Sequence, residues 1–186
     1  VVRMGGQIVV NSTLGQGTTF SVTIPFDAGE AISYEPEEEP QDMIPLKDRH
    51  ILLAEDNLLN MEIATELLKM RGADVTPAED GRKALEAFQA AEPYYFDAVL
   101  MDMQMPEMDG CESTQAIRAL DRPDARTTPI IALTANAFAE DIVRTTQAGM
   151  DAHLAKPINI EQLCATLTKL MSQRDGQRGI TPTEGE

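Results

Sequence analysis

The stretch FDAVLMDMQMPEMDG, residues 96–110, decides how this chain folds. A largely apolar run, residues 96–101, ends on Asp102, and Pro106 follows four residues later. A short and nearly continuous apolar run is typical of a strand that is buried on both faces of a sheet. Asp102 therefore stands at the carboxyl end of a buried strand, where a charged side chain calls for a functional explanation.

A regular alternation of two kinds of segment extends in both directions from this stretch, over residues 49–172. Short apolar runs alternate with segments whose apolar residues recur at helical spacing. The expected strands are HILLA (50–54), ADVTPA (73–78), FDAVLM (96–101), PIIALT (129–134) and AHLA (152–155). The expected helices are NLLNMEIATELLKM (57–70), DGRKALEAFQAA (80–91), GCESTQAIRAL (110–120), AFAEDIVRTTQA (137–148) and NIEQLCATLTKLM (159–171).

Five buried strands that alternate with five amphipathic helices predict an α/β fold with a parallel sheet covered on both faces. Right-handed crossovers make such a sheet doubly wound. The common flavodoxin-like arrangement has the spatial strand order 2-1-3-4-5 and places ligands outside the carboxyl ends of the strands.

Polar side chains follow four of the five predicted strands. Glu55 and Asp56 follow the first, Asp102 ends the third, Thr134 ends the fourth, and Lys156 follows the fifth. Strands one and three are neighbours in the expected order, so their three carboxylates converge and repel one another. A hard cation such as Mg²⁺ removes that repulsion, and an aspartate between Mg²⁺ and a lysine is suited to accept a phosphoryl group.

The flanking segments differ in composition from this region. Residues 1–26 contain two β-rich runs around the turn residues TLGQG and predict a β-hairpin. Residues 27–48 are rich in proline and acidic side chains and predict a linker. Residues 173–186 are polar and contain several glycines, so we expect a disordered tail.

Charge and composition exclude several classes of protein. The formal net charge of −16 argues against nucleic-acid binding. No apolar run has the length of a membrane span, so we expect no direct membrane contact and a cytoplasmic location, although a longer parent protein could be anchored in the inner membrane. Because the chain opens on Val1, we expect it to be a piece of a longer protein. Cys111 and Cys164 form no metal-binding or disulfide pattern.

Residues 49–172 resemble the receiver domain of two-component response regulators. The resemblance rests on LLAEDN after the first strand, VLMDMQMPEMDG around the third, ALTA after the fourth and LAKP after the fifth. It implies that Glu55 and Asp56 bind Mg²⁺ together with Asp102 and the main-chain carbonyl of Gln104. It also implies that Asp102 is the phosphoacceptor.

The resemblance assigns three further roles near the carboxyl ends of the last two strands. Thr134 matches the switch hydroxyl, Lys156 matches the phosphate-contacting lysine, and Pro157 matches the proline that typically follows it in a cis peptide bond. His153 departs from the family pattern, which usually has Tyr or Phe at this switch position. The imidazole can still act as a switch, or coupling to the output can differ.

Residues 1–26 resemble the end of the ATP-binding domain of histidine kinases, with GQGTTF as a glycine-rich box. The chain has no phosphorylatable-histidine helix, no asparagine box and no adenine pocket, so we expect it not to bind ATP. The order of kinase end, linker and receiver resembles a hybrid sensor histidine kinase. It implies a phosphohistidine donor, in cis or in trans, and a histidine phosphotransfer protein as the acceptor.

Two other functions fit parts of the sequence. A pseudo-receiver would act only as a protein-binding module, but the presence of all five site residues argues against it. A hydrolase of the aspartyl-phosphate type commonly has a second aspartate two residues after the nucleophile, and Gln104 cannot donate a proton in the same way. Both alternatives are therefore weaker than a phosphoacceptor that catalyses only its own phosphorylation and dephosphorylation.

Overall fold

The computed structural model describes residues 5–15, 17–25, 45–135 and 139–177. The chain forms two compact units, Val1–Glu39 and Pro40–Glu186. Most of the predicted linker and the residues after 177 lie outside the described residues. Within the described part of the chain, no helix combines the length and the apolar character that crossing a membrane requires.

The first unit contains the predicted hairpin. Strands β1 (Gln7–Thr13) and β2 (Gly17–Thr23) pair antiparallel, with Ile8 opposite Val22 and Val10 opposite Phe20. Gly15 has a φ of +80°, a backbone conformation that glycine adopts without a steric cost. Every residue of both strands is exposed within the described structure.

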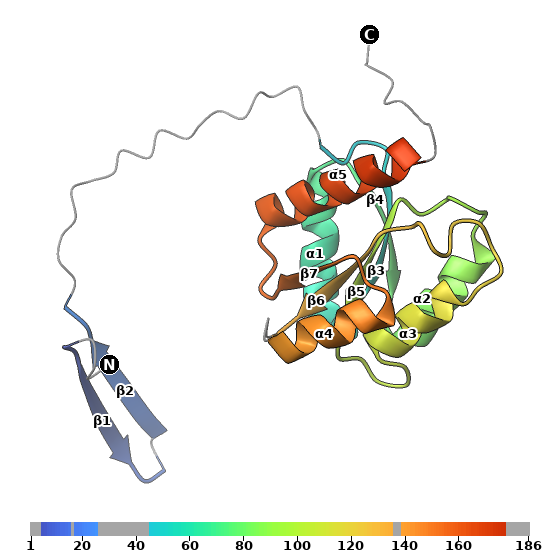
Figure 1. The fold of residues 1–186 in the computed structure, drawn as a ribbon. Helices are drawn as coiled ribbons and strands as arrows, with labels where there is room; N and C mark the ends of the chain where they lie inside the picture. Colours follow the sequence, from blue (N-terminus) through green and yellow to red (C-terminus); the bar gives the residue numbers. More distant parts are fainter. Residues whose placement is uncertain (1–4, 16, 26–44, 136–138, 178–186) are drawn as a thin grey trace. The chain divides into compact units, whose positions relative to one another are not determined.

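The second unit has the predicted doubly wound fold (Figure 1). Its elements alternate along the chain as β3 (His50–Ala54), α1 (Leu58–Met70), β4 (Asp74–Ala78), α2 (Gly81–Ala90), β5 (Ala98–Asp102), α3 (Gly110–Arg118), β6 (Ile130–Thr134), α4 (Ala139–Ala148), β7 (Ala152–Ala155) and α5 (Ile160–Gln177). The five strands are parallel in the order β4-β3-β5-β6-β7. This order is the predicted 2-1-3-4-5, so the predicted fold class is confirmed.

Alternate residues of the strands face two separate cores. Helices α1 and α5 cover one face of the sheet, and α2, α3 and α4 cover the other (Figure 1). Leu53 and Leu100 belong to the first core, whereas Leu52 and Met101 belong to the second. β5 and β6 are buried along their whole length, as the apolar runs predicted.

Local signals in the sequence fix where the helices begin and end. The Asn57 side chain caps α1 by accepting hydrogen bonds from the backbone N–H groups of Leu59 and Asn60. Asp109 and Glu112 form a capping box at the start of α3. Gly72 and Gly149, with φ of +88° and +92°, follow α1 and α4 in the left-handed conformation that commonly ends helices.

Two predicted boundaries need correction. The tail predicted to begin at 173 is helical as far as Gln177, because Arg174 is buried and donates hydrogen bonds to the carbonyl and carboxylate oxygens of Asp97, both at 2.8 Å. The linker predicted to extend to 48 ends earlier, because Leu46 is fully buried in the core against α1. Its backbone N–H donates to the carbonyl of Arg71 at 3.0 Å.

Asp97 makes the stability of this unit dependent on pH. Burial by itself would raise the pKa of its carboxyl, but hydrogen bonds from Arg174 and from the backbone N–H of His50 outweigh burial and lower the pKa below its ordinary value. A carboxyl with a lowered folded-state pKa stabilises the fold above its unfolded-state pKa, and this contribution is lost as the pH falls through the folded-state pKa.

We therefore expect Asp97→Asn to lower the free energy of unfolding at pH 7 by about 2 kcal/mol. The difference from the unchanged protein should shrink as the pH falls below about 4, because the carboxyl then takes up a proton first in the unfolded chain and, at its lowered pKa, later in the folded protein. Urea unfolding at a series of pH values measures both effects. The exposed Asp121 provides a control. The free energy of unfolding of Asp121→Asn should stay within about 0.5 kcal/mol of that of the unchanged protein at every pH. If the free energy of unfolding of Asp97→Asn stays lower than that of the unchanged protein by the same amount down to low pH, this explanation is contradicted.

Candidate functional site

The sheet brings the predicted polar residues to one edge. Because the strands are parallel and in register, Ala54 pairs with Met101, Asp102 with Leu133, and Thr134 with Ala155. The residues that end or follow these strands therefore lie together at the carboxyl edge. The structure brings together Glu55, Asp56, Asp102 and Lys156 there, as the sequence predicted.

Three carboxylates form a cluster at this edge. Each side chain contributes one oxygen atom, and these three oxygens, from Glu55, Asp56 and Asp102, all lie within 4.8 Å of one another. Glu55 and Asp102 are 2% and 6% exposed, whereas Asp56 is exposed to solvent. Oxygen donors at this spacing, one of them open to solvent, fit a small hard cation that keeps some of its water. The donor set therefore fits Mg²⁺.

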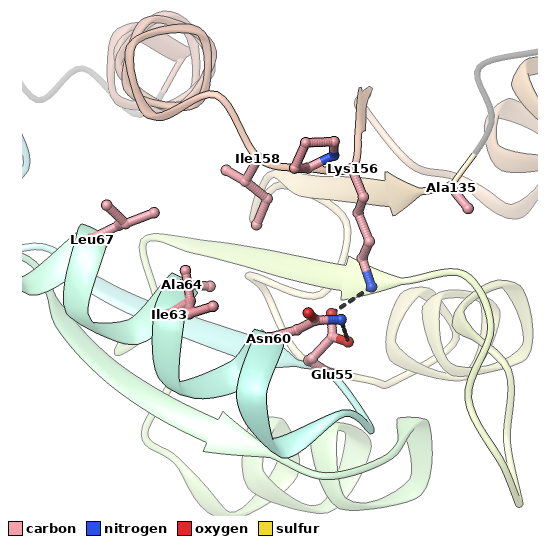
Figure 2. Close-up of a pocket in the computed structure, with 9 residues that line it drawn as sticks. Glu55, Asn60, Ile63, Ala64, Leu67, Ala135, Lys156 and Ile158 are labelled. Atoms are coloured by element: carbon pink, nitrogen blue, oxygen red, sulfur yellow. Dashed lines mark hydrogen bonds and ion pairs between the residues drawn. The ribbon is translucent and has the colours of Figure 1, made fainter. Parts of the chain in front are cut away.

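Lys156 supplies the positive charge beside the cluster. Its Nζ lies 2.5 Å from Glu55 Oε2 and 2.6 Å from Asp102 Oδ2, and Figure 2 shows the side chain reaching down to Glu55. Burial by itself would lower the pKa of this ammonium, but the hydrogen bonds and charges of Asp102 and Glu55 outweigh burial and raise the pKa above its ordinary value. Lys156 is therefore a fixed cation at neutral pH.

The loop after β5 packs closely around Asp102. The backbone N–H of Gln104 donates to Asp102 Oδ1 at 3.2 Å, which orients the carboxylate. A Cβ atom on Gly110 would lie 2.2 Å from the carbonyl oxygen of Asp102, so only glycine fits there. From the sequence Gly110 was predicted only to begin a helix, since the pattern of residues does not report this contact. The metal contact of the Gln104 carbonyl stays a prediction.

The two predicted switch residues, Thr134 and His153, lie in different parts of the structure. Thr134 is buried at the end of β6, and its carbonyl accepts a hydrogen bond from the backbone N–H of Lys156 at 2.7 Å. His153 is half-buried in β7 and lines a groove with Thr145 of α4 and Thr166 of α5. The structure thus brings His153 to the groove between α4 and α5 and not to the carboxylate cluster. The Lys156–Pro157 peptide bond is cis, as expected.

Asn60 is a residue of the site that the sequence analysis missed. Its side-chain Nδ2 donates to Glu55 Oε1 at 2.9 Å (Figure 2). The only available signal was the position of an amide side chain in the first turn of the helix that follows Glu55. Spacing alone does not tell whether such a side chain turns back toward the strand end.

A pocket of about 370 Å³ opens beside the cluster. Ile63, Ala64 and Leu67 of α1 form one wall, and Ile158 lies on the other side (Figure 2). Pro157 also lines the pocket. Glu55, Asn60 and Lys156 form its polar part. The pocket therefore combines an apolar surface with direct access to the carboxylates.

Comparisons with known proteins agree with this geometry. Residues 51–168 match the response regulator receiver domain family. The aerobic respiration control sensor protein ArcB of Escherichia coli K12 is 35% identical over 184 residues, which is 98% of this chain and 22% of ArcB. The hybrid signal transduction histidine kinase I of Dictyostelium discoideum is 40% identical over 119 residues, 63% of this chain and 7% of that protein. The chain thus spans about a fifth or less of these relatives.

Solved structures show the same fold. The receiver domain of sensor histidine kinase PA1611 from Pseudomonas aeruginosa is 38% identical, with a TM-score of 0.61 over 67% of this chain and 98% of that one. That structure has a magnesium ion coordinated in its active site cleft. The chemotaxis protein CheY4 of Vibrio cholerae is 31% identical, with a TM-score of 0.61 over 66% of this chain and 98% of its own.

Proposed function

The chain belongs to the response regulator receiver domain family, and from this premise we propose that it is a phosphoacceptor in a two-component phosphorelay. Asp102 accepts a phosphoryl group from phosphohistidine with the help of Mg²⁺ and passes it to a histidine phosphotransfer protein. One observation carries the proposal. Asp102 is buried at the end of β5, shares a cluster with two other carboxylates, and lies 2.6 Å from Lys156.

The transfer follows from the residues around Asp102. An Asp102 carboxylate oxygen attacks the phosphorus atom, the P–N bond of phosphohistidine breaks, and the imidazole leaves with the electron pair and then takes a proton. The product is an acyl phosphate on Asp102. Bound Mg²⁺ would supply positive charge to the phosphoryl oxygens, with Glu55, Asp56, Asp102 and the Gln104 carbonyl as its protein ligands.

The surrounding side chains assist this step. Lys156 keeps a charged ammonium beside the attacking carboxylate, where it can stabilise the negative charge on the moving group. The Gln104 backbone N–H restrains the Asp102 side chain. Thr134 is the proposed switch hydroxyl, and the β7–α4–α5 groove that contains His153 is the proposed place where the change is read.

The test is direct phosphorylation of the chain by a small acyl-phosphate donor. We expect the intact mass to rise by one phosphoryl group in the presence of Mg²⁺ and to stay unchanged when EDTA removes the metal. A donor of this kind needs no protein partner, so the result reports on the site alone.

The segments before the receiver support a hybrid kinase as the parent protein. The similarity to ArcB covers 98% of this chain and therefore includes the hairpin as well as the receiver. We assign residues 1–26 to the end of a histidine-kinase ATP-binding domain, and the segment from residue 27 up to the buried Leu46 to the linker. Since the phosphoryl group of such a kinase originates from ATP, we place the receiver in the cytoplasm.

The partner's docking surface is assigned to α1 and the pocket beside it. Leu58, Leu59 and Ile63 are 73%, 64% and 51% exposed, an unusual set of large apolar side chains for a surface helix. They lie on the helix that begins directly after the carboxylate cluster. A partner that seats an apolar helix here would bring its histidine to the site.

We expect Ile63→Glu to slow phosphotransfer with a phosphorylated histidine phosphotransfer protein by tenfold or more, because a charge would be buried in an apolar contact. Phosphorylation by the small acyl-phosphate donor should not change. Val143→Glu provides a control, since Val143 is a 55% exposed apolar residue on α4. Equal phosphotransfer rates for Ile63→Glu and the unchanged protein would show that the partner docks on another surface.

A further inference from the structure

Both oxygens of the Glu55 carboxylate have a partner. Oε1 accepts a hydrogen bond from Asn60 Nδ2 at 2.9 Å, and Oε2 lies 2.5 Å from Lys156 Nζ (Figure 2). The first partner is a neutral amide and the second is a cation. Glu55 is 2% exposed, so solvent contributes little to its orientation.

We propose that Asn60 is a positioning residue that orients Glu55 for the divalent cation, and that Lys156 competes with the cation for Glu55. The proposal rests on the proposed function, because it takes the carboxylate cluster as the Mg²⁺ site. The two partners of Glu55 then have opposite effects on metal affinity.

The reason lies in their charges. The amide of Asn60 fixes one oxygen of a side chain with several rotatable bonds, and it leaves the negative charge of the carboxylate available. The ammonium of Lys156 neutralises part of that charge at Glu55 Oε2, and the same ammonium also contacts Asp102 Oδ2. A cation that binds Glu55 must displace the ammonium but can keep the amide, as outer hydrogen-bond partners of metal ligands generally do.

Local structure restrains Asn60 independently of this contact. Its backbone N–H donates to the capping side chain of Asn57 at 3.1 Å, in the first turn of α1. The backbone position of Asn60 is therefore set by the helix cap, and its side chain remains available for Glu55. Loss of the amide should remove the orientation of Glu55 without unfolding the helix.

The experiment measures Mg²⁺ binding to the full chain by isothermal titration calorimetry with magnesium chloride. Asn60→Leu keeps a similar side-chain volume but removes the donor, and it should weaken Mg²⁺ binding about tenfold. Lys156→Met removes the competing charge and should strengthen binding. Thermal unfolding without metal should show Asn60→Leu to be as stable as the unchanged protein.

Asn159→Ala is the matched control for a purely structural asparagine. The Asn159 side chain accepts a hydrogen bond from the backbone N–H of Gln162 at 2.8 Å at the start of α5, so its loss should lower thermal stability but leave Mg²⁺ affinity unchanged.

The possible outcomes separate the two proposals. Weaker binding for Asn60→Leu at unchanged stability, with tighter binding for Lys156→Met, supports the inference. Unchanged binding for Asn60→Leu, or weaker binding that only accompanies lower stability, overturns it and leaves the proposed function standing. An unchanged protein that binds no Mg²⁺ overturns the proposed function and the inference with it.

Discussion

Replacement of Asp102 by Asn is expected to abolish the phosphoryl adduct completely. The amide is nearly the same size as the carboxylate, so the buried strand end should keep its packing. It has no anionic oxygen to attack phosphorus, and it removes one of the three carboxylates of the cluster. Intact mass spectrometry after incubation with Mg²⁺ and a small acyl-phosphate donor measures the loss.

The control for this substitution is Glu107→Gln, an exposed acidic residue on the same loop that should leave the adduct intact. An adduct that survives Asp102→Asn would assign the acceptor to another residue, and Asp56 would then be the first to examine. If the unchanged protein forms no adduct while remaining folded, titration with beryllofluoride distinguishes rapid hydrolysis from a module that only binds proteins. Binding of beryllofluoride would indicate hydrolysis.

Gly110→Ala is expected to be among the most destabilising single substitutions in the receiver. The new methyl group would lie 2.2 Å from the carbonyl oxygen of Asp102 and 3.1 Å from Met101 Cγ. Because the closest atom belongs to the backbone of a fully buried strand, no side chain can move aside to relieve the overlap. We expect the free energy of unfolding to fall by about 3 kcal/mol, measured by urea unfolding.

The same substitution should also slow phosphorylation, since relief of the overlap displaces the strand end that positions Asp102. Gly176→Ala is the matched control, because no atom lies within 4 Å of the added Cβ and the residue is in helix α5. Alanine there should be neutral or stabilise the helix by up to about 1 kcal/mol. Equal stability of the two variants would show that the β5–α3 loop tolerates a larger residue.

The fold and the carboxylate cluster were predictable because they depend on strand order. Once the alternation of strands and helices set the order 2-1-3-4-5, Glu55, Asp56 and Asp102 had to meet at one edge, whatever the details of their side chains. Lys156 was predictable for the same reason, because its length allows it to reach across the intervening strand.

The features that were missed depend on contacts that periodicity does not report. Asn60 belongs to the site only because its side chain turns back to Glu55. Arg174 extends α5 by hydrogen bonds to Asp97, 77 residues away in sequence, where the composition alone suggested a tail. Leu46 follows Met43, Ile44 and Pro45 at the end of a segment rich in proline and acidic residues, and nothing in that local pattern distinguishes a buried side chain from a linker residue.

The burial of Leu46 fixes the point at which the preceding segment of the chain joins the receiver. Leu46 and Asp48 bond to the end of α1 through Arg71 and Gly72, at the amino edge of the sheet. Asp102 lies at the opposite edge, a full strand of five residues or about 16 Å away. The described residues that lead into the receiver, 45–48, are therefore held at the edge of the sheet opposite Asp102, and they do not cover the carboxylate cluster.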